Sequence, residues 1–298
     1  MMVAGCGQSY EEKRKVSHKR RMQQLREDSA ALKVAVVPTL DCLPLFLAKE
    51  RKLFDSLGVD VRLKLFTAQM DCDTAVLGGS VEGVVTDLVR AERMQKHGTP
   101  LRYVSSTNAY WQLYSNRMAR IRELKQLDDK MIAMTRYSAT DLLAGVAVDS
   151  GKLKSERLYK IQVNDVDIRL RMLLGYELDA ALLTEPQATG ARLAHHHLLL
   201  DSRKLSLQMG VIAFREKSLK DKERQKQLDV FCRGYNMACD SLTRHGIGKY
   251  RDLVVKYCKV KESLADSLPA GIKFHHIAEP LEADVERAKK WLVNNEGK

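Results

Sequence analysis

The sequence predicts an α/β protein made of two similar halves, with a helical segment after them. From residue 32 onward, short apolar runs alternate with amphipathic stretches. Alternating strands and helices are typical of layers built around a largely parallel sheet. The series runs twice, interrupted by a basic, irregular stretch from Asn116 to Lys125, and the pattern from Leu219 onward is mostly helical.

Each predicted element follows from the spacing of its apolar residues. Leu32–Val37 is mostly apolar, as buried strands are, and Pro38 ends it. Leu43–Phe54 has the spacing of a helix, and Gly58 follows as a stop signal. The predicted strands are 32–37, 59–66, 83–86, 101–107, 131–134, 159–163, 180–183, 197–200 and 211–214. The predicted helices are 43–54, 68–77, 88–97, 139–150, 167–174 and 186–194.

Length and composition are those of a folded protein with two domains or lobes. The chain has 298 residues, of which 45% are hydrophobic and 30% charged, and domains usually span about 100–200 residues. This composition excludes a disordered or collagen-like chain, and the sequence lacks a run of 18 apolar residues. The net charge of +12 fits nucleic acid, a membrane surface or anionic ligands, and charge alone does not choose among them.

Cysteine and histidine spacing argues against a metal site. The six cysteines are scattered and form no C-x-x-C pair, so we expect neither a disulfide scaffold nor structural zinc. A disulfide bond between Cys42 and Cys72 remains an open alternative. His195–His197 leads into the predicted strand 197–200, and consecutive residues of an extended chain point to opposite faces and chelate poorly. The sequence also lacks G-x-S-x-G, H-E-x-x-H and Walker motifs, so we expect neither catalysis nor a cofactor.

The first residues resemble a lipid-attachment signal. Val3-Ala4-Gly5-Cys6 is similar to the bacterial lipobox, in which a peptidase cuts before the cysteine and its sulfur receives a diacylglycerol. Only five residues precede Cys6, so we expect the natural start to lie upstream of Met1, in a longer signal peptide. Residues 10–31 carry seven basic and four acidic side chains with few apolar anchors. They predict a solvated helix or a flexible tether, and without interleaved aromatic residues they do not indicate nucleic-acid binding.

Residues 32–218 resemble the substrate-binding proteins of ABC importers for nitrate, sulfonates, taurine and thiamine-pyrimidine precursors. In the first half, Pro38–Pro44 (PTLDCLP) leads from a strand into a helix, and Leu77–Gly79 precedes a strand that ends at Thr86-Asp87. In the second half, Gly175–Pro186 (GYELDAALLTEP) is similar to the family's glycine, its Asp-Ala-Ala strand and its Glu-Pro turn. Lys130–Ala133 (KMIA) is similar to the family's lysine lead into a strand.

The resemblance implies a type II periplasmic-binding-protein fold. Two lobes, each a mixed sheet flanked by helices, would be joined by crossovers near Tyr114–Arg117 and Arg203–Gln208, with a cleft between them and a helical C-terminal tail. Residues 1–31 would be a lipobox remnant and polar tether. Lobe one would comprise residues 32–116 and 206–298, and lobe two residues 117–205.

The carboxyl ends of the strands predict where the ligand binds, because loops from both lobes converge there. The loop Thr135–Thr140 lies between a strand and a helix, and a helix start offers unpaired N–H groups and partial positive charge. Ser138 and Thr140 with these amides would therefore hold a carboxylate or sulfonate, and Arg136 would add a bidentate contact. The alternative is that Ser138 or Thr140 only caps the helix.

The remaining candidates each allow two interpretations. Asp41 either binds a ligand amine or caps its helix. The same two interpretations apply to Thr86 and Asp87. Tyr110 and Trp111 stack on a planar ligand or pack at the hinge. Asn164, Thr184 and Glu185 follow predicted strands of lobe two. Asn164 either reaches the cleft or caps the next helix. Glu185 either accepts hydrogen bonds from a ligand amine or stabilises the hinge backbone. The predicted ligand-binding residues are Asp41, Cys42, Thr86, Asp87, Tyr110, Trp111, Thr135, Arg136, Tyr137, Ser138, Thr140, Asn164, Thr184 and Glu185.

The resemblance therefore implies a monomeric substrate-binding lipoprotein of an ABC importer, anchored through Cys6 on the periplasmic side of a bacterial membrane. It would capture a small anionic or heterocyclic solute and deliver it to a permease driven by a separate ATPase. The expected partners are the solute, the permease with its ATPase and the membrane, but not nucleic acid. The alternative is an enzyme of thiamine-precursor or menaquinone biosynthesis on the same fold.

Overall fold

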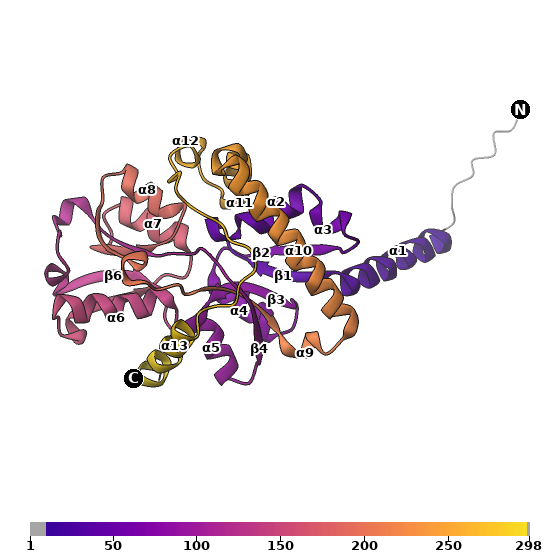
Figure 1. The fold of residues 1–298 in the computed structure, drawn as a ribbon, viewed down its shortest axis with the longest axis horizontal. Helices are drawn as coiled ribbons and strands as arrows, with labels where there is room; N and C mark the ends of the chain where they lie inside the picture. The colour runs from indigo at the N-terminus through magenta and orange to yellow at the C-terminus, as the bar shows by residue number, and fades with distance from the viewer. Residues whose placement is uncertain (1–9, 297–298) are drawn as a thin grey trace, which may run out of the picture.

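The computed structural model describes residues 10–296 and divides them into two α/β lobes (Figure 1). Lobe one is built on a five-stranded sheet in the order β2-β1-β3-β10-β4, and lobe two on a five-stranded sheet in the order β7-β6-β8-β5-β9. The strands of lobe one are β1 (Leu32–Val36), β2 (Val61–Leu65), β3 (Gly83–Asp87), β4 (Leu101–Ser106) and β10 (Gly210–Arg215). Those of lobe two are β5 (Gln112–Ser115), β6 (Lys130–Met134), β7 (Leu158–Gln162), β8 (Ala180–Leu183) and β9 (His197–Asp201). The predicted fold class is confirmed.

The two sheets have the same plan. In lobe one β1 runs parallel to β2 and β3, and β10 is inserted antiparallel between β3 and β4. In lobe two β6 runs parallel to β7 and β8, and β5 is inserted antiparallel between β8 and β9. Each sheet therefore receives one strand that has just crossed from the other lobe.

The first crossover lies earlier than the sequence predicts. β5 pairs with β8 and β9 through its whole length, so the chain has already entered lobe two at Gln112, and the predicted crossing at Tyr114–Arg117 is wrong. The segment that connects β4 to β5 is 107–111. The return, between β9 and β10, contains the predicted second crossing at Arg203–Gln208.

Helices cover both sheets and carry the apolar core. Their bounds are α2 (Leu43–Glu50), α3 (Leu53–Ser56), α4 (Gln69–Leu77), α5 (Leu88–Lys96), α6 (Ala139–Gly151), α7 (Val166–Leu174), α8 (Gln187–Leu193), α9 (Glu216–Leu219), α10 (Lys222–His245), α11 (Arg251–Cys258), α12 (Glu262–Ala265) and α13 (Glu282–Asn295). The ring of Phe231 on α10 stacks on Phe54 at 5.7 Å and meets the edge of Phe214 at 5.3 Å. All three rings are fully buried, so α10 closes the core of lobe one.

The C-terminal helix α13 lies where the two lobes meet. Its buried residues Ala288 and Leu292 belong to an apolar cluster that includes Val84 and Leu88 of lobe one and Leu143 of lobe two. Figure 1 shows α13 beside α5, close to α6. The tail therefore packs against both lobes on the side away from α10.

The polar segment at the N-terminus forms helix α1 (Tyr10–Ala30), which projects from the body (Figure 1). At 1.5 Å per residue it is about 30 Å long. Asp28 at its end pairs with Lys33 at 3.1 Å, and the guanidinium of Arg224 donates to the carbonyl oxygens of Ala30 and Ala31. Cys6 and the rest of the lipobox lie outside the described residues. Within residues 10–296, no helix combines the length and apolar character that a membrane crossing requires.

The close approach between β3 and β10 gives a stability prediction. A Cβ added at Gly83 would lie 2.6 Å from the Phe214 ring, which is fully buried. Because overpacking typically costs 1–3 kcal/mol, we expect Gly83→Ala to lower the free energy of unfolding by about 2 kcal/mol in denaturant titration. Gly248, where an added Cβ meets nothing within 4 Å, is the control. Equal effects of Gly83→Ala and Gly248→Ala would contradict the packing.

Candidate ligand-binding cleft

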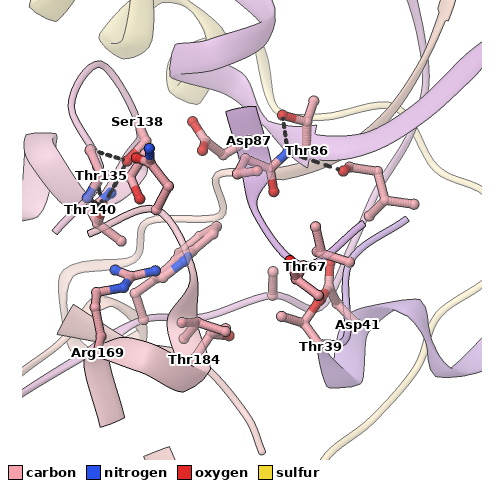
Figure 2. Close-up of a pocket in the computed structure, with 17 residues that line it drawn as sticks. Thr39, Asp41, Thr67, Thr86, Asp87, Thr135, Ser138, Thr140, Arg169 and Thr184 are labelled. Carbon is pink, nitrogen blue, oxygen red and sulfur yellow. Dashed lines mark hydrogen bonds between the residues drawn. The ribbon is translucent and has the colours of Figure 1, made fainter. Parts of the chain in front are cut away.

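The carboxyl ends of strands from both sheets enclose one pocket between the lobes (Figure 2). Its cavity volume is about 60 Å³. A buried water needs about 10–15 Å³ on this measure, so the cavity has room for a solute of a few non-hydrogen atoms in this conformation. The lining residues are Val37, Thr39, Asp41, Thr67, Gln69, Val85, Thr86, Asp87, Ala109, Trp111, Thr135, Ser138, Thr140, Asn164, Val166, Arg169 and Thr184.

Asp41 is a carboxylate in the lobe-one wall without a cationic partner. It lies in a single turn of 3-10 helix (Leu40–Cys42) that follows β1. Its Oδ2 accepts a hydrogen bond from Thr107 Oγ1 at 3.2 Å. Burial, which leaves 9% of the residue exposed, raises the pKa of Asp41 above its ordinary value. No ion pair involves Asp41 in the described part of the chain.

Asp87 connects the two lobes. It is the N-cap of α5, where its Oδ1 accepts from the backbone N–H of Arg90 at 3.1 Å. The same oxygen accepts from the N–H of Ala139 at 3.0 Å, at the start of α6 in lobe two. Burial is the main cause that raises the pKa of Asp87 to about 6, against the lowering effect of Arg90 and both N–H groups. A lobe-one carboxylate therefore occupies the positive end of a lobe-two helix.

The amides at the start of α6 already have acceptors within the protein. Ala139 N donates to Asp87, Thr140 N to the Ser138 hydroxyl at 3.1 Å, and Tyr137 N to Asp141 Oδ2 at 2.9 Å. An anionic ligand bound at this helix start, as the sequence predicts, would therefore compete with Asp87 for the N–H group of Ala139. Ser138 is an N-cap, as the alternative interpretation has it, while the side chains of Thr135, Ser138 and Thr140 do line the pocket.

Arg169 is the cleft residue that sequence reasoning missed and that most changes the chemistry. It lies on α7, is only 5% exposed, and donates from Nη1 to the carbonyl of Leu182 at 2.7 Å. Its Nε is buried without a hydrogen-bond partner. Burial lowers its pKa to about 10, and no carboxylate among residues 10–296 forms an ion pair with it. Figure 2 shows its guanidinium turned toward the pocket.

A signal for Arg169 was present in the sequence. Arg169 is three residues after Val166 and four before Leu173, both buried in α7, so it falls on the apolar face of that helix. An arginine on an apolar face is rarely buried unless something pairs with it. Thr39, Thr67 and Gln69 were also missed, although Thr67 directly follows the predicted strand 59–66.

Tyr110 and Glu185 lie beside the cleft, at the crossover, rather than in its lining. Tyr110 donates its hydroxyl to Glu185 Oε1 at 2.9 Å, and the guanidinium of Arg203 lies 3.9 Å from the Tyr110 ring centroid. Glu185 Oε2 accepts from Thr189 Oγ1 at 2.6 Å. These contacts join both crossover segments to α8, which fits the hinge interpretation. Trp111, the next residue, does line the pocket.

The other predicted residues divide between the cleft and its surroundings. Arg136 is exposed and does not line the pocket. The guanidinium groups of Arg136 and Arg93 lie 5.3 and 4.6 Å from the centroid of the Tyr137 ring. Cys42 is buried with its sulfur 3.8 Å from Thr39 Oγ1. Cys42 and Cys72 are free thiols. The remaining predicted residues that line the pocket are Thr86, Asn164 and Thr184.

The histidine cluster forms a different feature. His195–His197 lines a separate pocket with Arg117, Arg120 and Arg122, and His196 Nδ1 accepts from the backbone N–H of Arg117 at 3.1 Å. Within the described chain, no three His, Cys, Asp or Glu side chains are grouped to hold a metal ion.

The buried carboxyl group of Asp87 gives a pH prediction. Because its folded-state pKa rises from 3.8 to about 6, its contribution to folding stability is complete below pH 3.8 and is lost as the pH rises through 6. Asp87→Asn keeps an oxygen that accepts both N–H groups but cannot ionise. Denaturant titrations of both proteins should show the wild type losing about 2 kcal/mol relative to Asp87→Asn between pH 4 and pH 7. Asp71→Asn, at an exposed position, is the control. A stability difference between wild type and Asp87→Asn that does not change with pH, or changes no more than that for Asp71→Asn, would contradict a buried ionisation.

Comparisons with known proteins identify the fold. No family model and no curated protein matches the sequence. A ligand-binding component of an ABC-type import system from Staphylococcus aureus, with zinc bound, is 14% identical and has a TM-score of 0.72, covering 89% of this chain and 91% of its own. The alkanesulfonate-binding protein SsuA from Xanthomonas axonopodis, bound to MOPS, is 18% identical with the same TM-score and coverage. A Candida albicans protein with the generic periplasmic binding protein fold is 14% identical, has a TM-score of 0.70 and covers 90% of this chain and 92% of its own. The fold that residues 38–44 and 175–186 predict is therefore confirmed: the chain has the two-lobed fold of the periplasmic binding proteins.

Proposed function

We propose that the protein is the solute-binding component of an ABC importer and that it binds a small solute with an anionic group between its lobes. The fold is shared with import-system binding proteins. The cleft is lined by hydroxyl and amide side chains from both lobes, with three charged ones among them. Its small cavity suits a compact solute rather than a polymer.

The buried guanidinium of Arg169 is the observation that carries the proposal. A buried charge is costly unless a counter-charge or hydrogen bonds compensate it. Arg169 has one hydrogen bond, an unpartnered Nε and no ion pair within the described chain. A carboxylate, sulfonate or phosphate group on the solute would supply both the charge and the acceptors, in the paired geometry that guanidinium groups prefer.

Closure of the cleft would couple binding to transport. Arg169 belongs to lobe two and Asp41 and Thr86 to lobe one, so a solute that touches all three makes its full set of contacts only when the lobes are together. Binding would then shift the open–closed equilibrium toward the closed form, in proportion to the contacts that only this form offers. The closed form would dock on a permease, and a separate ATPase subunit would drive uptake.

A lipid anchor on Cys6 would hold the protein at the membrane, on the periplasmic side. Val3–Cys6 supports this part of the proposal. Helix α1 would then be a spacer of about 30 Å between the anchor and lobe one. Residues 14–27 of this helix are exposed and mostly charged or polar, which suits a solvated spacer. The alternative of an enzyme on the same fold is favoured by no specific contact in the cleft.

The Arg169 assignment predicts a specific loss of binding. We expect a thermal-shift screen of small carboxylates, sulfonates and phosphates to yield a stabilising anion, and Arg169→Met to weaken its binding by about 10–100-fold in calorimetry, because bonds to charged groups contribute about 1.5–3 kcal/mol. Arg171→Met is the matched control: it is two residues away on α7, exposed, and paired with Asp167. Equal affinities of wild type and Arg169→Met would contradict the assignment.

The anchor predicts a modified N-terminus. Mass spectrometry of the protein from its native membrane should find Cys6 as the first residue, with a diacylglycerol on its sulfur. Two or three acyl chains are enough for stable anchoring, so Cys6→Ala should move the protein from the membrane fraction to the soluble fraction. An unmodified Cys6 within a longer chain would refute the anchor and leave the solute-binding proposal intact.

A further inference from the structure

We propose that the solute carries a protonated nitrogen as well as its anionic group, and that Asp41 binds this nitrogen while Arg169 binds the anion. The inference rests on the proposed function and assigns the second half of the same site. It makes the ligand class a small zwitterion, with its two charges on opposite walls of the cleft.

The first argument is that Asp41 lacks the compensation that comparable carboxylates have. Asp87 accepts from two N–H groups. Asp73 pairs with the guanidinium of Arg90, and Glu185 has Arg192 at 3.7 Å besides two hydroxyl donors. Asp41 is nearly as buried, with 9% of the residue exposed against 6% for Asp87. Its partners in the structure are hydroxyl groups and its own backbone N–H, without a cation. A cation from outside the chain would supply what the fold does not.

The second argument is geometric. Asp41 is in the wall that lobe one contributes, directly after β1, and Arg169 is in the wall of lobe two. Figure 2 shows them on opposite sides of the pocket, with Thr184 between them in this view. Each group alone is a buried charge with an incomplete environment. A zwitterion of suitable length would neutralise both and would bring one attractive charge to each lobe.

The third argument concerns selectivity. A solute with only an anionic group would satisfy Arg169 but would meet a second acidic group, Asp41, in the same cavity. In a poorly hydrated site that repulsion is stronger than in water. Burial raises the pKa of Asp41, so a purely anionic solute would favour its protonated form. A cationic nitrogen would favour the ionised form instead, and the two ligand types therefore differ in the protons they exchange on binding.

Paired probes separate these possibilities. Calorimetry of the purified chain at pH 7 would compare propanoate with 3-aminopropanoate, butanoate with 4-aminobutanoate, and propane-1-sulfonate with 3-aminopropane-1-sulfonate. In at least one pair we expect the amino compound to bind at least tenfold more tightly. Asp41→Asn should remove that advantage without weakening the anion-only partner. Asp71→Asn, an exposed carboxylate on α4, should leave the advantage unchanged.

A second measurement follows proton exchange. Calorimetry of wild type and Asp41→Asn at pH 5 in two buffers of different ionisation enthalpy counts the protons exchanged. We expect the amino compound to release more protons than its anion-only partner, because a bound cation lowers the pKa of the carboxyl groups that line the cleft, Asp41 and Asp87. The part of this difference that Asp41→Asn removes belongs to Asp41. Anion-only probes that bind as tightly as their amino partners, with no difference in proton exchange, would overturn the inference and leave the anion proposal standing. Failure of every probe to bind at millimolar concentration would count against the proposed function itself.

Discussion

The hydrogen bond from the Ala139 amide to the carboxylate of Asp87 determines how the rest of the cleft is arranged. It spans the two lobes at the point where β3 ends and α6 begins, and it is fully buried. Nearby, the guanidinium of Arg90 contacts the carbonyl oxygen of Arg136 at 3.4 Å, and Asn164 donates to the sulfur of Met70 at 2.9 Å. Together these three contacts bridge the two lobes beside the cleft.

This contact also redistributes the charges that a ligand would meet. Helix starts are the usual place for an anion in α/β proteins, but here the protein's own carboxylate occupies that place. Among the described residues that line the pocket, the guanidinium of Arg169 has neither an ion pair nor a partner for its Nε. The carboxyl group of Asp41, unlike that of Asp87, accepts no N–H group from a helix start. The arrangement of charged groups in this cleft thus differs from what strand-end loops alone suggest, although the fold is the common one.

Much of the fold was predictable because its strands are apolar runs and its helices have regular apolar spacing. The strand β5 was not, because its ends are polar: Gln112 is buried through a bond to Asp201 at 2.7 Å, and Ser115 through a bond to the carbonyl of Ile121 at 2.6 Å. Periodicity detects apolar burial and misses strands buried through hydrogen bonds. The shifted crossover follows directly from this missed strand.

The site was predicted in part for the same kind of reason. Strand ends identify Asp41, Thr86, Asp87, Thr135 and Thr184, which all line the pocket. The strand-end rule does not reach Arg169, because this residue enters the cleft from within a helix. Nor does it show that a given carboxylate already has partners: Asp87 and Asp41 look alike in the sequence, and only their contacts distinguish them.

Helix α1 would affect the kinetics of the proposed delivery to a permease. Under the proposed anchoring of Cys6, a spacer of about 30 Å would restrict the two lobes to a thin layer above the bilayer. Tethering of this kind raises the effective concentration of a docking partner toward the millimolar range. The encounter between the loaded protein and a permease would then be limited by lateral diffusion and orientation, and a weak, rapidly reversible docking contact would suffice for repeated cycles.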